Sequence, residues 1–294
     1  MLIRDAQPAS LYSCDWGTII DTVVRPSTQP DHKSVPILSS QSEWPSNQTI
    51  DENEVARFEK LALRWWEPDG PMSALLKLNP ARIGYIRDQV AAAREPATLK
   101  NRPLDGLKLL DIGCGGGILS EPMARLGAKV TGIDPARLNI QVATLHAREM
   151  ALDIEYRCQS LEEAAKSGEQ YDIVLAMEVL EHVADKSTFI RLATSCVTSG
   201  GSLFLATLNR TLKSFSLAIV GAEYILNWLP RGTHDWHKFS RPSVLVKALI
   251  DNGLEPTDLT GAQYRFLADR WSLGKDLSVN YMVHAHKPTK EVMG

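Results

Sequence analysis

The sequence has few cysteines, no long apolar run and no excess of basic charge, and each absence argues against a class of protein. Its four cysteines are far apart and include no C-x-x-C pair, which disfavours a zinc knuckle or a disulfide framework and favours a reducing compartment. No apolar stretch reaches the roughly 18–20 residues of a membrane-spanning helix. A formal charge of -3 and a pI near 6.2 make a broad nucleic-acid-binding face a poor hypothesis.

What is present is ordinary globular composition, with 44% hydrophobic and 23% charged residues over 294 positions. Residues 1–50 differ, because they hold five of the 16 prolines and show no periodic apolar pattern. We predict that they form a flexible leader, without the features of a secretory or transit peptide. Residues 51–106 are predicted to form a helical cap, with one helix starting near Asp51 and another starting at Asn79-Pro80 and ending near Ala93.

From Leu107 onward, short apolar runs alternate with helical patterns, which is typical of parallel βαβ units. We therefore predict an α/β fold with a doubly wound, mostly parallel sheet, in a domain over 107–287. An insert at 210–241 would follow the fifth strand, and 288–294 would be a tail. The expected strands are 108–112, 129–133, 154–158, 171–177, 202–207, 254–260 and 278–286.

A glycine-rich turn follows the first strand, with glycine at four of the five positions 113–117. A dinucleotide fingerprint does not fit, because Ile118 or Ser120 stands where its third glycine belongs, and the phosphate-binding G-K-[ST] is absent. Asp111 opens the pattern, and Asp134 ends the second strand, where a carboxylate accepts both ribose hydroxyls of a nucleoside. S-adenosylmethionine carries an ammonium and a sulfonium but no phosphate, so this combination predicts that cofactor.

A second turn, after the fourth strand, carries Glu178, Glu181 and His182. On a helical turn this spacing would place all three side chains on one face. They could ligate a hard cation such as Mg²⁺, which lowers the pKa of an acceptor hydroxyl, or His182 could act as a general base. A third interpretation is a packing turn with no metal. Met177, at the end of the same strand, is either a neighbour of the adenosine or a core residue.

The D-x-G-x-G-x-G arrangement resembles the first motif of class I methyltransferases, and further segments resemble the ubiquinone-biosynthesis O-methyltransferases from about residue 51. These segments are 64–66, 70–71, 78–83, 178–182, 207–210, 220–226, 232–235 and 279–282. The resemblance implies a Rossmann-like, seven-stranded enzyme that methylates phenolic hydroxyls of polyprenylated catechol or quinol intermediates, at two steps of the pathway. One departure, Gln263–Leu267 in place of an Asn-Pro-containing stretch, affects the details expected of the substrate pocket.

The same resemblance assigns roles to individual residues. The implied cofactor contacts are Arg82, Gly113, Gly115, Asp134 and Met177. The implied Mg²⁺ ligands and catalytic residues are Glu178, Glu181 and His182.

The segment Ser214–Leu229 is mostly apolar with a narrow polar strip, and it is too short to span a bilayer. Its composition fits an interfacial helix as well as a buried lid on the sheet. A polyprenylated substrate favours the membrane contact, so we expect a peripheral protein, cytoplasmic in a bacterium or on the matrix side of the mitochondrial inner membrane. Other ubiquinone-biosynthesis proteins are candidate partners, and nucleic acid is not. The alternatives are a methyltransferase for another small phenol or amine, and a non-catalytic cofactor-binding membrane scaffold.

Overall fold

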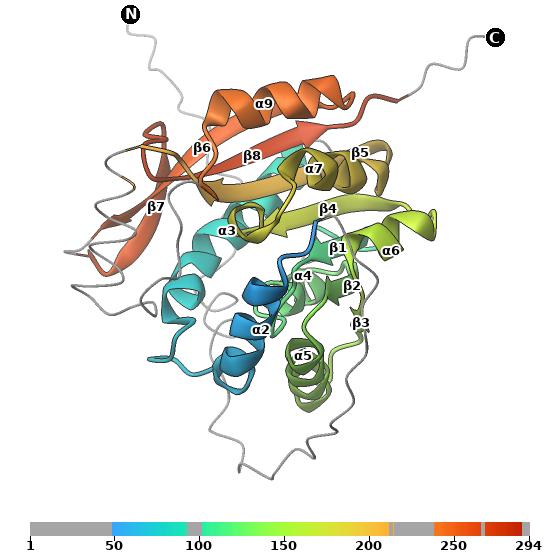
Figure 1. Cartoon of the computed structure of the whole chain (residues 1–294), viewed down its shortest axis with the longest axis vertical. Coiled ribbons are helices and arrows are strands. Elements are labelled where there is room, and N and C mark those ends of the chain that lie inside the picture. The colour runs from blue at the N-terminus through green and yellow to red at the C-terminus, as the bar shows by residue number, and fades with distance from the viewer. Residues whose placement is uncertain (1–48, 93–101, 212–213, 215–237, 266–267, 290–294) are drawn as a thin grey trace, which may run out of the picture.

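A computed structural model describes residues 49–92, 102–211, 214, 238–265 and 268–289 of the chain. These residues form a central sheet with helices packed on both of its faces (Figure 1). No helix within the described residues is long and apolar enough to cross a bilayer. Residues 1–48 of the predicted leader lie outside the description, and the boundaries predicted for the cap and the domain stay predictions.

The sheet has eight strands in the order β3-β2-β1-β4-β5-β8-β6-β7. Their bounds are β1 Lys108–Ile112, β2 Lys129–Asp134, β3 Glu155–Cys158, β4 Tyr171–Met177, β5 Val197–Leu208, β6 Glu255–Arg265, β7 Arg270–Gly274 and β8 Asn280–His286. The first five strands of this order pair in parallel, and β8, β6 and β7 add antiparallel pairings. The predicted doubly wound, mostly parallel class is confirmed.

The expected number of seven strands is one short, because β6 runs beyond the predicted end and folds back with β7 as a hairpin. Gln263 pairs with Ser272 and Arg265 with Arg270 in this hairpin, at the edge of the sheet. The sequence pattern from Gln263 was interpreted as part of a substrate pocket, and no separate strand was expected after it. Phe266 and Leu267 lie outside the described residues.

The helices connect and cover the strands. Their bounds are α2 Glu52–Leu61, η1 Ala62–Arg64, α3 Ser73–Ala92, α4 Ser120–Arg125, α5 Arg137–Glu149, α6 Leu161–Lys166, η3 Leu180–His182, α7 Lys186–Ser195 and α9 Pro242–Asp251. Helix α2 begins as predicted, because the Asp51 carboxylate caps it by accepting a hydrogen bond from the Asn53 N–H.

Helix α3 contradicts the prediction that a helix starts at Asn79-Pro80. It begins at Ser73, and Pro80 lies inside it. An internal proline costs a helix roughly 3 kcal/mol, but the preceding Ala, Leu and Lys residues favour helix and Leu78 is buried. Asn79 does not cap the helix, since its side-chain amide donates instead to the Ile118 carbonyl at 2.5 Å.

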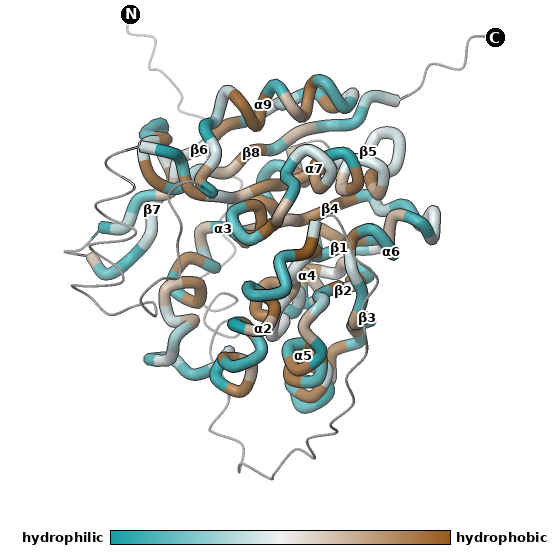
Figure 2. Tube along the Cα trace, viewed as in Figure 1, coloured by the Kyte–Doolittle hydropathy of each residue, from teal (hydrophilic) through white to brown (hydrophobic). Residues whose placement is uncertain are grey.

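Two apolar layers hold the sheet between its helices. On one face, Phe189 of α7 and Leu245 and Leu249 of α9 are buried in a cluster with strand residues. On the other face, Ile86 of α3 and Met123 of α4 belong to a second cluster. Figure 2 shows the corresponding pattern, with apolar strands inside and helices that alternate between apolar and polar residues. Because both faces are covered, functional side chains are expected at the carboxyl edge of the parallel strands.

Candidate functional site

The glycine turn after β1 adopts a backbone that favours glycine. Gly113, Gly115 and Gly117 have φ values of 67°, 54° and 85°. The N–H groups of Gly113 and Cys114 both donate to the Ile133 carbonyl, at 2.8 and 3.1 Å, so the turn is fastened to the end of β2. The turn lies where the sequence pattern predicted it, and its glycines let neighbouring groups pack closely on the main chain.

Aromatic side chains from the N-terminal helices pack directly on this turn. A Cβ added to Gly116 would stand 2.5 Å from Trp65 Cβ, and one on Gly115 would collide with the Trp65 ring. The Trp66 indole N–H donates to the Gly116 carbonyl at 3.0 Å, and the Trp66 ring stacks on His146 at 3.7 Å between centroids. The two tryptophans therefore cover the glycine turn.

Asp134, at the end of β2, is a buried carboxylate tied to the same turn. It accepts hydrogen bonds from the N–H groups of Gly115 at 3.0 Å and Ala136 at 2.8 Å, and from the Asn139 side-chain amide at 3.3 Å. Burial raises its pKa to about 6, against the lowering effect of these hydrogen bonds. Asn139 also accepts a hydrogen bond from the Trp65 indole at 2.8 Å, so the tryptophan and the carboxylate share one polar chain.

Arg82, on α3, is a buried cation at the same edge of the sheet. Its side chain is 3% exposed, and within the described part of the chain its buried Nε and Nη2 atoms make no hydrogen bond. Nη2 lies 3.3 Å from a carboxylate oxygen of Glu178. Asp111 was expected to face a ligand, but its carboxylate accepts a hydrogen bond from the Ser120 hydroxyl at 2.6 Å, and burial raises its pKa to about 6.

The turn after β4 does not place its three predicted side chains on one face. Glu178 has a φ of 58° and η3 is a short 3-10 turn, so the geometry of a regular helical turn does not apply. The Glu178 carboxylate faces Arg82, whereas Glu181 is buried and accepts a hydrogen bond from the Thr207 hydroxyl at 2.8 Å. Burial and the neighbouring Glu178 charge raise the pKa of Glu181 well above its usual range.

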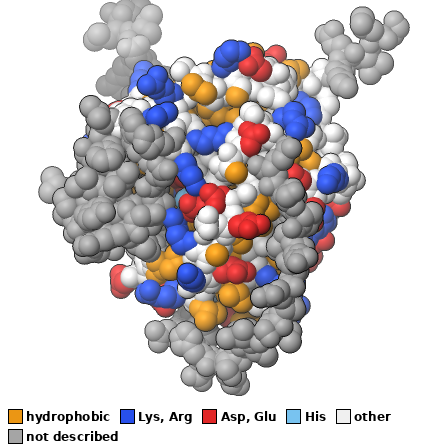
Figure 3. Space-filling view, in the orientation of Figure 1, with side chains coloured by type: hydrophobic (Ala, Val, Ile, Leu, Met, Phe, Trp, Pro, Cys, Tyr) orange, Lys and Arg blue, Asp and Glu red, His pale blue; other side chains and the backbone are white. Residues whose placement is uncertain are grey.

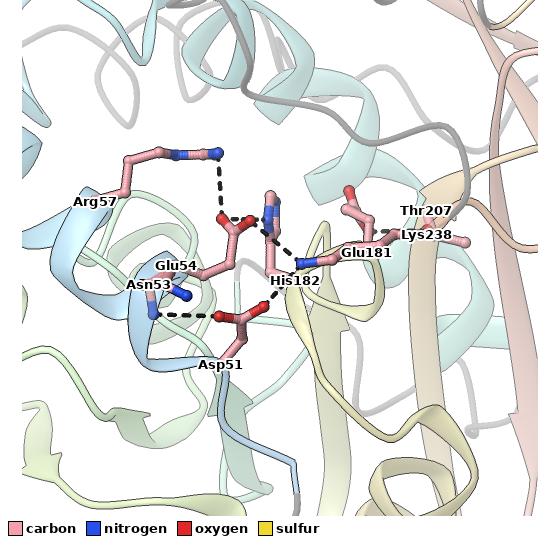
Figure 4. A network of polar contacts seen from close by, with 8 residues as sticks. All are labelled: Asp51, Asn53, Glu54, Arg57, Glu181, His182, Thr207 and Lys238. Atoms are coloured by element: carbon pink, nitrogen blue, oxygen red, sulfur yellow. Dashed lines mark hydrogen bonds and ion pairs between the residues drawn. The ribbon is translucent and has the colours of Figure 1, made fainter.

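His182 points in a third direction, toward α2. Its Nδ1 lies 3.2 Å from a carboxylate oxygen of Glu54 (Figure 4). The Phe58 ring meets the imidazole ring edge-on, with 5.1 Å between the ring centroids. Lys238 binds the same Glu54 at 3.5 Å and Asp51 at 2.9 Å. Burial alone would raise the pKa of Glu54, but His182 and the nearby cations lower it to about 2.

Comparisons with known proteins identify the chain's family. A model of the methyltransferase domain family matches residues 82–259. The ubiquinone biosynthesis O-methyltransferase of Methylobacterium sp. strain 4-46 is 53% identical over 83% of this chain and 98% of its own length. The same-named enzyme of Methylobacterium nodulans is 54% identical over 82% and 96%. The chain belongs to the ubiquinone biosynthesis O-methyltransferases. The predicted class of enzyme, an S-adenosylmethionine-dependent O-methyltransferase, is thereby confirmed.

Solved structures confirm the fold. Magnesium protoporphyrin IX methyltransferase from Synechocystis PCC 6803, crystallised with bound SAH (S-adenosylhomocysteine), is 23% identical and superposes with a TM-score of 0.56. The match covers 81% of this chain and 100% of that one. The Rossmann-like architecture predicted from the strand and helix pattern is therefore the architecture of a known class I methyltransferase.

The Mg²⁺ site expected from the family resemblance is not assembled in this structure. Glu178, Glu181 and His182 have three different partners, and the described residues contain no group of three His, Cys, Asp or Glu side chains that could hold a metal. The three residues as placed do not fit the ion, because Arg82 occupies one carboxylate and Glu54 the imidazole. We therefore derive no catalytic step through a metal.

Several contacts of the site were not foreseen from the sequence. The sequence patterns assigned no role in this site to Glu54, Lys238 or Asn139. Met177 is 7% exposed and packs within the α3 and α4 cluster, so its predicted contact with the cofactor stays a prediction. Of Ser214–Leu229 only Ser214 is described.

Proposed function

We propose that this methyltransferase acts on phenolic hydroxyls of polyprenylated catechol or quinol intermediates of ubiquinone biosynthesis, at both O-methylation steps. The observation that carries the proposal is the identity above 50% with two ubiquinone biosynthesis O-methyltransferases over nearly their whole length. The carboxyl edge of the sheet supports it, since a glycine turn, a ribose-type carboxylate and a buried arginine gather there.

In this proposal the chain's own residues bind the cofactor and fix its orientation. The cofactor, when bound, supplies a methyl group on a positively charged sulfur. Asp134 accepts hydrogen bonds from the ribose hydroxyls, and the absence of side chains at Gly113 and Gly115 lets the cofactor approach the main chain. Arg82, whose buried guanidinium forms an ion pair with Glu178 through Nη2, binds the carboxylate of the methionyl part with its other N–H groups. Fixed geometry of this kind supplies much of the rate enhancement of methyl transfer.

The acceptor is proposed to lie beside the turn after β4. We assign His182 as the base that takes the phenol proton, while the phenol oxygen attacks the methyl carbon and the carbon–sulfur bond breaks to leave SAH. Glu54 holds the imidazole from the opposite side. Glu178 and Glu181 line the same turn, and the Glu178–Arg82 ion pair links it to the cofactor side.

The Mg²⁺ hypothesis stays a prediction that requires rearrangement. Glu178 and Glu181 are neighbours whose charges interact, which supports a shared cation, but His182 would have to leave Glu54 to join them. Turnover is therefore measured in EDTA and after addition of Mg²⁺, for the wild type and Glu178→Ala. A loss in EDTA that Mg²⁺ restores only in the wild type supports the site, and undiminished turnover of both proteins in EDTA contradicts it.

We also propose contact with a membrane surface through Ser214–Leu229, at the cytoplasmic membrane of a bacterium or the matrix side of the mitochondrial inner membrane. The apolar composition of this segment and the hydrophobic polyprenyl chain of the proposed acceptor support the proposal. Flotation with anionic liposomes tests it. Deletion of the segment is expected to abolish flotation, and unchanged flotation of the deletion variant contradicts the proposal.

The experiment that tests the proposed function is methyl transfer to short-chain polyprenyl catechols, followed by mass spectrometry. We expect the product to gain one methyl group on oxygen and SAH to form in equal amount. A simple catechol without a prenyl chain, and an aromatic amine, serve as control acceptors. Faster methylation of either control than of the prenylated catechol would contradict the proposed substrate.

A further inference from the structure

Asn79 is a buried polar residue at the cofactor edge that does not cap a helix as predicted and has no role in the proposed mechanism. It is 3% exposed and lies on α3, one turn before Arg82. Its side-chain Nδ2 donates to the Ile118 carbonyl, directly after the glycine turn, at 2.5 Å. Its Oδ1 is buried and has no hydrogen-bond partner among the residues that the structure describes. Native proteins rarely leave such an acceptor unpaired, so the atom indicates a donor still to be bound.

The orientation of the Asn79 amide is fixed by its own chemistry. A carbonyl oxygen only accepts, so the group facing Ile118 has to be the NH₂ group, and the other end has to be the oxygen. Asn79 Oδ1 can therefore accept a hydrogen bond from a donor but cannot bind an anion.

Arg82, on the same face of α3, is a cation whose N–H groups can donate to an anion. Residues three apart on a helix are neighbours, and here the second one is a cation whose Nε and Nη2 lack hydrogen-bond partners. Its guanidinium lies beside Glu178 at the end of β4, whereas Asn79 reaches the residue that follows the glycine turn of β1. Strands β1 and β4 are paired neighbours, so the two side chains lie along one short stretch of the edge.

We propose that Asn79 binds the α-ammonium group of S-adenosylmethionine, while Arg82 binds the carboxylate of the same amino acid. The cofactor has few donors that could serve the Asn79 oxygen. The ribose hydroxyls belong to Asp134 at the end of β2, on the far side of the glycine turn. The methyl group has to reach the turn after β4, so the aminocarboxypropyl arm is the part of the cofactor nearest to α3. The inference rests on cofactor binding by this chain and adds a specificity-determining residue.

The experiment pairs variants of the protein with analogues of the product. Affinities of full-length wild type, Asn79→Ala and Arg82→Ala are measured by calorimetry for SAH, for an analogue lacking its amino group and for one lacking its carboxylate. We expect Asn79→Ala to weaken SAH binding about 10- to 100-fold, the size expected for a hydrogen bond to a charged group. Its affinity for the amino-free analogue is expected to match that of the wild type. Arg82→Ala is likewise expected to weaken SAH binding, and its affinity for the analogue lacking the carboxylate is expected to match that of the wild type.

Two further variants keep the test informative. Asn79→Ser keeps a polar side chain but removes the amide oxygen and is shorter, so its hydroxyl oxygen does not stand where Oδ1 does. It therefore tests the proposal even where Asn79→Ala does not fold. Asp88→Ala changes an exposed residue of the same helix and is expected to leave all three affinities unchanged. If the Asn79 variants weaken all ligands equally, the residue is only structural and the proposal is overturned. If the wild type itself fails to bind SAH, it is cofactor binding that fails, which is a different result.

Discussion

The two functional turns of this protein lie at the ends of adjacent strands, yet one gathers its groups and the other spreads them. The glycine turn after β1 binds the end of β2 through backbone N–H groups and carries the Asp134 carboxylate against it. In the turn after β4, Glu178 and Glu181 interact with each other, but Glu178 also pairs with Arg82, Glu181 with Thr207 and His182 with Glu54. A motif made of backbone conformations is determined locally, whereas convergence of side chains depends on the tertiary partners that surround them.

The two turns are nevertheless in contact. A Cβ on Gly113 would stand 2.7 Å from a Val179 methyl group, so the glycine turn packs against the first residues after Glu178. A cofactor bound on one turn therefore borders the acceptor turn. Binding of SAH reports on the glycine turn after β1, whereas turnover also reports on the turn after β4.

The largest effect is expected at Asp134. Replacing it by alanine removes the only predicted partner of the ribose hydroxyls and leaves the N–H groups of Gly115 and Ala136 without their acceptor. Loss of hydrogen bonds to a charged group predicts at least 100-fold weaker SAH binding, measured by calorimetry. Asp153→Ala, at an exposed position of the same domain, is the matched control and is expected to bind normally. If Asp134→Ala bound SAH with normal affinity, the glycine turn would not be part of the cofactor site.

The comparison also explains what the sequence could predict. The strands and Asp134 were found because alternation of apolar runs and a carboxylate at a strand end are local patterns. The start of α3 was missed because Pro80 signals a helix N-terminus, whereas the helix-favouring residues before it and the burial of Leu78 make the longer helix favourable. Glu54 and Lys238 were missed as site residues because they lie 128 and 56 residues from His182 along the chain, and no local pattern joins them.

A smaller effect separates backbone strain from packing at the glycine turn. Gly115 and Gly106 both have positive φ, but only Gly115 has the Trp65 ring where a Cβ would stand. Each change to alanine costs roughly 1–3 kcal/mol in strain, or a few degrees of melting temperature. We expect Gly106→Ala to lose only the stability that this strain costs. Gly115→Ala is expected to lose more stability and to bind SAH at least tenfold more weakly.

Calorimetry of SAH binding and thermal unfolding measure both glycine variants. Adding Trp65→Ala to Gly115→Ala is expected to restore part of the stability, because the clash with the indole disappears while the strain persists. Equal behaviour of the Gly115 and Gly106 variants would show that Trp65 does not pack on the turn.

The affinity for SAH is expected to depend on pH through Asp134. Burial raises the pKa of this carboxyl to about 6 in the free protein, and the ribose hydroxyls bind its ionised form. Protonation therefore competes with binding, so affinity is constant above about pH 7 and falls up to tenfold per pH unit below about 6. Asp111, whose pKa is also raised to about 6, and Glu59 are the neighbouring acids that influence it. Asp111→Asn is expected to keep the slope, and Asp134→Asn to lose it.

The smallest effect is expected at Glu54. A substitution there tests the turn after β4, which carries His182, without changing a residue assigned to the cofactor. Glu54→Gln keeps the shape of the side chain but removes the charge that faces His182 at 3.2 Å and Lys238 at 3.5 Å. Weakening one partly buried charged hydrogen bond predicts a three- to tenfold, roughly 1 kcal/mol, loss of kcat with an unchanged affinity for SAH. Glu52→Gln, in the same first turn but exposed, is the matched control and should not alter kcat. An equal loss in SAH affinity would mean that α2 supports the glycine turn, through Phe58 and Trp65, rather than His182.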